Sequence, residues 1–253
     1  MLHIVKMVIN TCDVNVLFSY GLKDKFIDKT KSYITRCKND KFVSLRTVKE
    51  TFQATFSSNI NEIIDIVVGV LNNTEEEIQK RNKRLSSNPR MEQRMFEQNL
   101  FGSFKSEKDI GKDEATKWLK LIFGDVLDYA IISDKSKFVV IWEDALKKSD
   151  IIAAETYASF RSKFKNFVEA PRFNHEKQHK WEAIIKNLKN SEDIFTDIDD
   201  EDIYIATEFL TYIDERTSNL MFSSYDKNII KSLNKIKEKL KLNYPDSVWL
   251  LDR

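Results

Sequence analysis

Glycine and proline are scarce in this sequence of 253 residues, which contains 5 Gly and 3 Pro. A many-stranded β-sandwich needs frequent tight turns, which these two residues favour, so their scarcity argues against that class. Neither charge is in excess, because 41 Lys and Arg balance 40 Asp and Glu to a formal net charge of +1. Bulk charge therefore gives no reason to expect a protein that coats nucleic acid or an anionic membrane. We expect long helices instead.

Cysteines and long apolar runs are also scarce. Cys12 and Cys37 do not form a C-x-x-C pair, so we expect free thiols in a reducing compartment. No apolar run approaches the roughly 20 residues that span a bilayer; the best run, residues 63–71, is broken by Asp65. The first residues have Lys6 inside their apolar stretch and lack a cleavage pattern, so no signal peptide is expected. The sequence predicts a soluble, cytoplasmic protein with no membrane partner.

With 42% hydrophobic and 32% charged residues, the chain can bury a sizeable core. The first 56 residues alternate between strand and helix patterns. Short apolar segments predict strands over residues 7–12 and 42–45, and helical spacing predicts a helix over 24–37. A second helix begins at Thr47, which has the form of a capping box with Glu50. This order predicts a parallel sheet with helical crossovers.

The rest of the chain divides into a helical middle and an alternating end. Helices are predicted over residues 113–129, 151–168 and 181–188, and residues 138–142 are ambiguous between strand and helix. Towards the end, the patterns predict a helix over 203–213 capped by Asp200 or Asp202, a strand over 219–223 and a helix over 227–242. We therefore predict an α/β core formed by residues 1–58 and 191–253, interrupted by a mainly helical insertion of residues 59–190.

Four carboxylates stand where such a core would bring them together. Asp13 follows the first strand, Glu50 lies in the first turn of a helix, Asp202 begins a late helix and Asp226 follows a late strand. Groups just past the carboxyl ends of parallel strands share one crevice. Carboxylates repel each other there unless a cation lies among them, and hard oxygen ligands select Mg²⁺ or Mn²⁺. Such ions can activate a water against a phosphodiester.

At these acids the sequence resembles the PIN-domain nuclease superfamily. The likeness covers roughly residues 5–56 and 195–250. Its motifs are VINTCDVNVL at 8–17, SLRTVKE at 44–50, DIYIA at 202–206 and FSSYDK at 222–227. The long stretch between the second and third acids departs from compact members of the family.

The resemblance implies a metal-dependent endoribonuclease with a three-layer α/β/α fold and RNA as its substrate. It implies four catalytic metal ligands, Asp13, Glu50, Asp202 and Asp226, with Asn15 and Ser224 in support. The alternative is a catalytically inactive PIN-like module whose helical insertion binds RNA or a protein partner. The insertion could also form a homo-oligomer.

A second register of the same motifs exists. Asp113 begins a helical segment, and residues 131–135 read as a strand that ends in Ser-Asp-Lys. A compact domain could then use Asp113 and Asp134 in place of Asp202 and Asp226. We favour Asp202 and Asp226, because the Ile-Ala helix and the hydroxyl two residues before Asp226 fit the family better.

Structural roles also explain the acids one at a time. Glu50 could serve only the capping box, and Asp202 and Asp226 are residues that commonly cap helix N-termini. Asp13 is harder to explain this way, because it ends a strand and starts no obvious helix.

Residues 175–179 match the H-E-x-x-H zinc protease pattern through His175, Glu176 and His179. That pattern belongs on a buried helix, whereas Lys177 and Gln178 are polar here. We interpret it as a coincidence on a solvated face, with a lesser possibility that His179 faces the acidic crevice.

Basic residues cluster at 80–84 and 161–165, and the second cluster is interleaved with Phe160, Phe164 and Phe167. Such a pattern can bind an RNA backbone while an aromatic ring stacks on a base. We favour the simpler interpretation, in which the phenylalanines are core and the basic side chains are in water.

Overall fold

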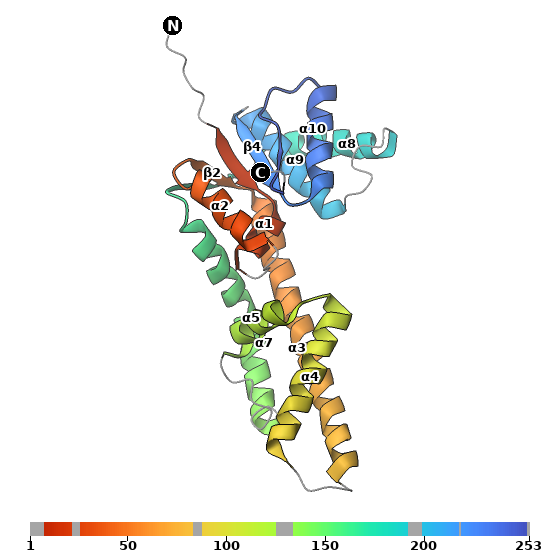
Figure 1. Cartoon of the computed structure of the whole chain (residues 1–253). Helices are drawn as coiled ribbons and strands as arrows, with labels where there is room; N and C mark the ends of the chain where they lie inside the picture. The colour runs from red at the N-terminus through yellow and green to blue at the C-terminus, as the bar shows by residue number, and fades with distance from the viewer. Residues whose placement is uncertain are drawn as a thin grey trace. The chain divides into compact units, whose positions relative to one another are not determined.

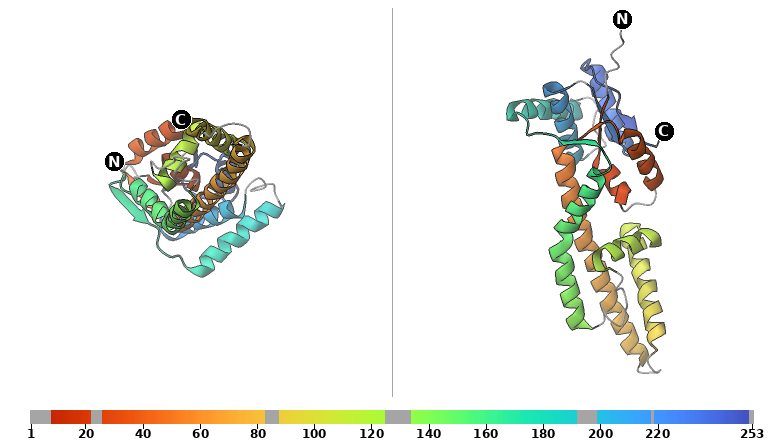
Figure 2. Two further views of the ribbon diagram at one scale, coloured as in Figure 1. Left: turned by 90° about the horizontal axis from the view of Figure 1, so that it is seen from below. Right: turned by 90° about the vertical axis from the view of Figure 1, so that its left-hand side faces the viewer.

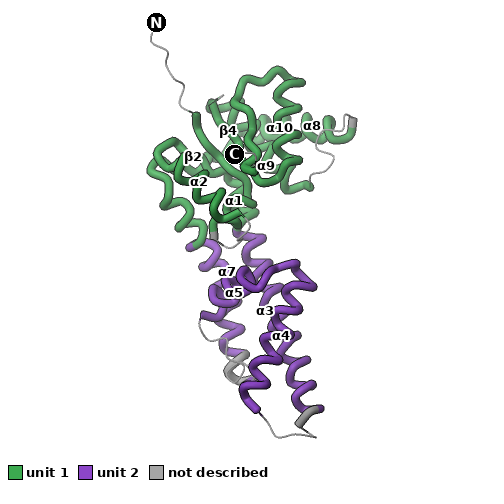
Figure 3. Tube along the Cα trace, viewed as in Figure 1, with its two compact units in different colours: residues 1–52, 156–253 green, residues 53–155 purple. Residues whose placement is uncertain are grey.

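The structure of the chain is a computed structural model that consists of two compact units. It describes residues 8–21, 26–82, 88–124, 134–191, 199–217 and 219–251. Unit 1 comprises Met1–Phe52 and Thr156–Arg253, and unit 2 comprises Gln53–Glu155 (Figure 3). Residues 156–190, which we had assigned to the insertion, belong to unit 1 by this division.

Unit 1 contains a five-stranded parallel sheet (Figure 1). Its strand order is β3-β2-β1-β4-β5, so β1 lies at the centre with β2 and β4 beside it. All four pairings are parallel. The strands are β1 (Ile9–Cys12), β2 (Lys41–Ser44), β3 (Asn166–Glu169), β4 (Leu220–Ser224) and β5 (Val248–Trp249). The predicted α/β fold with a short parallel sheet is confirmed at this level.

Helices make up most of the described chain (Figure 2). Unit 1 holds α1 (Val14–Gly21), α2 (Ile27–Cys37), α8 (His175–Ser191), α9 (Asp200–Glu215) and α10 (Lys227–Lys239). Unit 2 holds α4 (Pro89–Lys108) and α5 (Lys112–Phe123). The long helices α3 (Arg46–Asn82) and α7 (Lys135–Arg161) each belong to both units.

Aromatic side chains form much of the core beside β2. The ring of Phe42 on β2 stacks on that of Phe164 with centroids 4.2 Å apart, and on that of Phe167 at 5.6 Å. Phe160 and Phe164 are buried. This confirms the interpretation of these phenylalanines as core, because a buried ring has no free face for a nucleobase. The basic run at 80–84 lies largely outside the described residues.

The helix predicted over 151–168 is wrong in its second half. The helix α7 ends at Arg161, and the chain turns and then forms the edge strand β3, in which Phe167 pairs with Phe42. The spacing of Phe160, Phe164 and Phe167 suits a helix, but it also places all three rings against Phe42 when the chain turns between them. The ambiguous segment 138–142 is helical and belongs to α7. The sequence patterns also did not predict α1 or β5.

Unit 2 has its own core between its helices. The rings of Phe56 on α3 and Trp118 on α5 lie 5.1 Å apart, and Phe96 and Phe104 of α4 are fully buried. The helix α5 ends at Phe123, and Gly124 follows with a φ of 69°, which suits a residue without a Cβ. The predicted continuation of this helix to residue 129 lies outside the described residues.

The helix α3 is long and apolar. Over Arg46–Lys80 it meets the length and composition criteria for crossing a membrane, the one helix in the described ranges that does, and 44% of its most apolar stretch is buried. The core helix of a soluble protein meets the same criteria, and Phe56, Ile60 and Ile63 on α3 are buried in this structure. The structure is thus compatible with the predicted soluble protein.

Both cysteines are free, as predicted, and both are buried. Burial raises the pKa of the Cys12 thiol well above its ordinary value, and the charge of Asp13 raises it further. A buried thiol with a raised pKa is a poor nucleophile. The structure therefore supports no catalytic role for Cys12.

Candidate active site

Asp13 lies at the end of the central strand β1. Its backbone N–H donates to the carbonyl of Ser223 on β4 at 3.0 Å, which continues the β1–β4 pairing by one residue. The helix α1 begins at Val14, whose N–H donates to Asp13 Oδ1 at 2.7 Å. Asp13 therefore stands at the junction of a strand and a helix, and its side chain is buried.

Asn15 and Ser224 hold the other oxygen of Asp13. Asn15 Nδ2 donates to Asp13 Oδ2 at 2.8 Å, and Ser224 Oγ donates to the same oxygen at 2.7 Å. Asn15 Nδ2 also lies 3.0 Å from Ser224 Oγ, and Asn15 Oδ1 accepts from the N–H of Tyr225 at 3.2 Å. The structure thus brings the two predicted supporting residues onto the first acid, from α1 and β4.

Asp226 follows β4 and caps α10. Its N–H donates to Ser224 Oγ at 2.8 Å, and its Oδ1 accepts from the N–H of Asn228 at 2.6 Å. The capping role that the sequence suggested for Asp226 is therefore present. One carboxylate oxygen serves the cap, and Ser224 links Asp226 to Asp13.

Asp202 lies in the first turn of α9, but the helix is capped by Asp199, whose Oδ1 accepts from the N–H of Asp202 at 2.9 Å. The predicted caps, Asp200 and Asp202, are wrong by one and three positions. Burial, and after it the charges of Asp13, Asp199 and Asp226, together raise the pKa of Asp202 to about 7. The field of the other acids therefore reaches Asp202.

The same group of acids acts on Asp13. Burial raises the pKa of Asp13 to about 6, the hydrogen bonds from Ser224 and Val14 oppose the rise, and Asp226 and Asp199 add to it. We call Asp13, Asp199, Asp202 and Asp226 the acidic group. Like charges that add to the raised pKa of buried acids, as they do here for Asp13 and Asp202, are typical of a site that favours a cation.

The topology of the sheet explains why the acidic group forms. The chain runs outward from β1 to β2 and β3, then returns to the other side of β1 to form β4 and β5. The reversal lies between β1 and β4, and crevices at such points are where parallel sheets bind ligands. Asp13 and Asp226 follow these two strands, and Asp202 lies in the first turn of α9, the helix that precedes β4.

The carboxylate oxygens of the acidic group are ligands that suit a hard divalent cation, but the side chains are not positioned to coordinate one. Within the described ranges, no three Asp, Glu, His or Cys side chains are placed to hold a metal ion as they stand. Metal binding would therefore require side-chain movement among these acids. Asp13 and Asp226 keep lone pairs that the hydrogen bonds above do not use.

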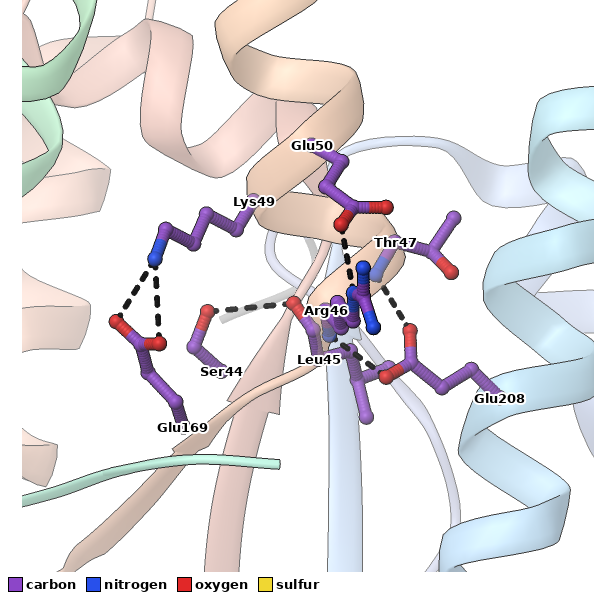
Figure 4. Close-up of polar contacts among 8 residues, drawn as sticks. All are labelled: Ser44, Leu45, Arg46, Thr47, Lys49, Glu50, Glu169 and Glu208. Atoms are coloured by element: carbon purple, nitrogen blue, oxygen red, sulfur yellow. Dashed lines mark hydrogen bonds and ion pairs between the residues drawn. The ribbon is translucent and has the colours of Figure 1, made fainter. Parts of the chain in front are cut away.

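Glu50, the remaining predicted ligand, is engaged elsewhere (Figure 4). Its Oε1 accepts from Arg46 Nε at 2.6 Å, and its side chain is 58% exposed. Glu50 is not among the main charges that raise the pKa of Asp13 or Asp202; it acts instead on Glu208. The structure brings three of the four predicted ligands together electrostatically, and it shows no contact that joins Glu50 to them.

The predicted capping box between Thr47 and Glu50 is wrong. The helix α3 begins at Arg46, so Thr47 lies inside its first turn. The N-terminus is capped instead by Glu208 of α9, whose two oxygens accept from the N–H groups of Arg46 and Thr47 at 2.6 Å each (Figure 4). Glu208 is 2% exposed. Burial raises its pKa, and these hydrogen bonds lower it.

Glu208→Ala is expected to destabilise the protein by about 2 kcal/mol, because it removes the acceptor of two part-buried N–H groups at the N-terminus of α3. The free energy of unfolding from urea titration measures the effect. Asp214→Ala, a change at an exposed position of the same helix, should cost less than about 0.5 kcal/mol. Equal losses in the two variants would contradict the capping role of Glu208.

The H-E-x-x-H segment begins α8 on the surface. Asn174 caps the helix by accepting from the N–H of Glu176 at 2.8 Å. His179 pairs with Glu182 of its own helix at 3.4 Å and is exposed. These local partners give no sign that His179 faces the acidic group, and the interpretation of the motif as a coincidence agrees with its position.

The rival register places its acids in unit 2. Asp113 is an exposed residue of α5, and Asp134 directly precedes α7. Residues 131–133 of its proposed strand lie outside the described residues. Asp13 lies in unit 1, where Asp226 and Asp199 act on it. The electrostatics therefore favour the register with Asp202 and Asp226.

Comparison with known proteins adds no relative. No protein-family model matches the chain, and searches of curated proteins and of solved structures found no significant match. The likeness to PIN-domain nucleases depends on the motifs and on the acids they carry.

The sequence patterns missed two acids that cap helices in the structure: Asp199 caps α9, and Glu208 caps α3. Asp199 lies within a dense acidic run at 197–202, where no single position stands out. Glu208 had a clearer signal, because it is a lone carboxylate within the otherwise apolar helical stretch 203–213. A buried carboxylate needs donors, and the N-terminus of another helix supplies them.

Proposed function

We propose that the protein is a metal-dependent endoribonuclease with a PIN-like three-layer α/β/α core opened by a helical insertion. The observation that carries the proposal is the acidic group at the β1–β4 reversal, in which the charges of Asp13 and Asp226 act on Asp202, and the charge of Asp226 acts on Asp13. The hydrogen bonds of Asn15 and Ser224 to Asp13 support it, because they fix the orientation of a buried carboxylate at the end of the central strand. A reducing cytoplasm would keep its thiols free.

Asp13, Asp202 and Asp226 would hold Mg²⁺ or Mn²⁺, whose chemistry is to activate a water and to offset charge on the phosphodiester under attack. The residues of the chain do the positioning. Asn15 and Ser224 fix one oxygen of Asp13, and the N–H of Val14 fixes the other. A cation in the acidic group would offset the charges of the neighbouring acids, which add to the larger effect of burial in raising the pKa of Asp13 and Asp202.

Glu50 stays a predicted ligand. To join the acidic group, it must leave Arg46, and an exposed ion pair of this kind contributes little to stability. If Glu50 is a ligand, Glu50→Gln lowers cleavage while Arg46→Ala leaves it unchanged or raises it. Full activity in Glu50→Gln would remove Glu50 from the proposed ligand set.

The proposal is tested by incubating the purified chain with single-stranded and structured RNA in Mg²⁺, in Mn²⁺ and in EDTA. Cleavage inside the strand in the presence of either ion, abolished by EDTA, is the expected result. Equal cleavage in EDTA would remove the metal from the mechanism.

Lys227 and Trp249 form a second feature at the same edge of the sheet. Lys227, next to Asp226, places its Nζ 4.6 Å from the centre of the Trp249 ring, and Trp249 Nε1 donates to the carbonyl of Tyr225 at 3.0 Å. A cation held over an aromatic ring beside the acids can bind an RNA phosphate. We therefore expect Lys227 to contact the substrate backbone.

Lys227→Ala is expected to weaken binding of single-stranded RNA and to reduce the slope of log Kd against log salt by about 0.7, the effect of one lost phosphate contact. Fluorescence anisotropy with the Asp13→Asn variant measures binding without cleavage. Lys231→Ala, an exposed change one turn further along α10, should leave the slope unchanged. An equal change of slope in both variants would contradict a specific contact.

The second candidate function is a catalytically inactive PIN-like module that binds RNA or a protein partner. The ion pair between Arg46 and Glu50 favours it, because it withholds one predicted ligand from the acidic group. RNA binding without cleavage in any divalent ion, together with no measurable Mn²⁺ binding, would decide for this alternative.

A further inference from the structure

The helix α7 has two faces that differ sharply in burial within unit 2. One face is buried through the small residues Ala145, Ser149 and Ala153. On this side α7 runs along α3, as Figures 1 and 2 show, and Ser57 Oγ of α3 donates to Asp150 of α7 at 2.8 Å. The other face points away from these contacts.

That outer face carries the two most exposed large apolar side chains among the described residues. Val140 is 66% exposed and Ile151 is 56% exposed. They are eleven positions apart, which is three helical turns or about 16 Å, so they lie on one line along the helix. Exposed apolar side chains aligned on one face are typical of an interaction surface.

Two opposite charges lie between these apolar residues on the same face. Asp144 is one turn from Val140, and Lys147 is one turn from Ile151; both are exposed. The order along the face is therefore apolar, acidic, basic, apolar. We call Val140, Asp144, Lys147 and Ile151 the α7 stripe.

The order of the α7 stripe is complementary to itself in an antiparallel arrangement. With a two-fold axis through the middle of the stripe, Val140 of one copy lies opposite Ile151 of the other, and Asp144 lies opposite Lys147. Each contact occurs twice, as two-fold symmetry requires. A parallel arrangement would instead place Asp144 opposite Asp144 and Lys147 opposite Lys147, which is repulsive.

The neighbouring charges follow the same symmetry. Glu143 lies opposite Lys148 across the same axis. Within one copy, Glu143 pairs with Lys147 and Asp144 pairs with Lys148, each one turn apart and exposed. Exposed pairs of this kind contribute little, so exchanging them for pairs between copies costs little.

We propose that the α7 stripe binds the α7 stripe of a second copy of the chain in antiparallel orientation and makes the protein a homodimer. The occupant is a second copy because the stripe supplies every complement that it needs. This inference uses unit 2 alone and does not depend on the nuclease proposal. A dimer would present two acidic groups on one assembly.

Sedimentation velocity of the full chain at concentrations up to about 100 μM tests the proposal. A dimer is expected. Asp144→Lys creates two Lys–Lys contacts per dimer and should raise the dissociation constant at least about tenfold. Adding Lys147→Asp to that variant restores both pairs and should restore the dimer. Glu97→Lys, the same charge change at an exposed site on α4, should have no effect.

Cysteine substitution tests the register. Val140→Cys combined with Ile151→Cys should give disulfide-linked dimers on oxidation, because the two positions lie opposite each other across the axis. Val140→Cys alone should not form such dimers, because the cysteine at position 140 of the other copy lies three helical turns away. Cys12 and Cys37 are buried and do not compete.

A chain that sediments as a single copy at the highest concentration would overturn the proposal and leave another protein as the partner of this face. A dimer that Asp144→Lys does not weaken, or that the double charge exchange does not restore, would overturn it as well. Either result is read from sedimentation and is independent of RNA cleavage.

Discussion

Asp13→Asn is expected to reduce RNA cleavage by about 10³-fold, equivalent to about 4 kcal/mol of the activation barrier. The substitution keeps the size of the side chain but removes its charge. It also replaces one of the two carboxylate oxygens by an amide nitrogen, which cannot accept a hydrogen bond. The bond that is lost is either the one from Val14 to Oδ1 or the pair from Asn15 and Ser224 to Oδ2. Initial rates of cleavage of a labelled RNA in Mn²⁺ measure the effect.

Asp200→Asn is the matched control, because Asp200 begins the same α9 helix as Asp202 and pairs with Lys189 at 3.9 Å outside the acidic group. It should retain full activity. Circular dichroism must show that both variants are folded. Unchanged cleavage by a folded Asp13→Asn protein would place the active site elsewhere.

The arrangement of Asn15 and Ser224 around Asp13 was predictable, because it depends on short motifs in the sequence. An apolar strand that ends in Asp-x-Asn places Asp13 and Asn15 within two residues of each other. Ser224 and Asp226 likewise follow one strand. The parallel pairing of β1 with β4 then brings these two short segments together in register. The strand and helix alternation predicted a parallel sheet formed by the two ends of the chain, but it did not predict which strands pair.

The partners of Glu50 and Glu208 were not predictable in the same way. Thr47 and Glu50 have the spacing of a capping box, but Glu208, 161 residues further along than Thr47, satisfies the N–H groups that the box would have used. Once Glu208 caps α3, Glu50 is free to pair with Arg46 one turn earlier. The contact of Glu208 with the N-terminus of α3 thus replaces the capping box that the local sequence predicted.

The edge strands β3 and β5 were not predicted, for a related reason. The strand β5 has two residues, and three of the four residues of β3 are exposed, so neither forms a buried segment like those of β1 and β2, which the sequence predicted. Their pairing with β2 and β4 selects the strand conformation. The helical pattern of Phe160, Phe164 and Phe167 was real, but it reflected three rings that pack on Phe42.

The metal-free protein is expected to lose stability as the pH rises from about 4 to about 8. The pKa of Asp13 in the folded protein is about 6 and that of Asp202 is about 7, against an ordinary value of 3.8 for both. The folded state therefore binds more protons than the unfolded state in this range, and the free energy of unfolding falls as those protons leave. For buried Asp13 the loss is about 3 kcal/mol, and it is smaller for the partly exposed Asp202.

Urea unfolding at a series of pH values, in EDTA and in Mg²⁺, measures this effect. Asp202→Asn should flatten the decline in EDTA, because it removes one acid whose pKa is raised in the folded protein. Mg²⁺ at about 100 times its Kd should add about 2.7 kcal/mol at pH 7.5 to the native protein and much less to Asp202→Asn. The exposed-site variant Asp200→Asn should behave as the native protein does. If Asp202→Asn declines as steeply as the native chain and Mg²⁺ stabilises neither, the acids do not act on one another and hold no cation, and the catalytically inactive module becomes the better account of this chain.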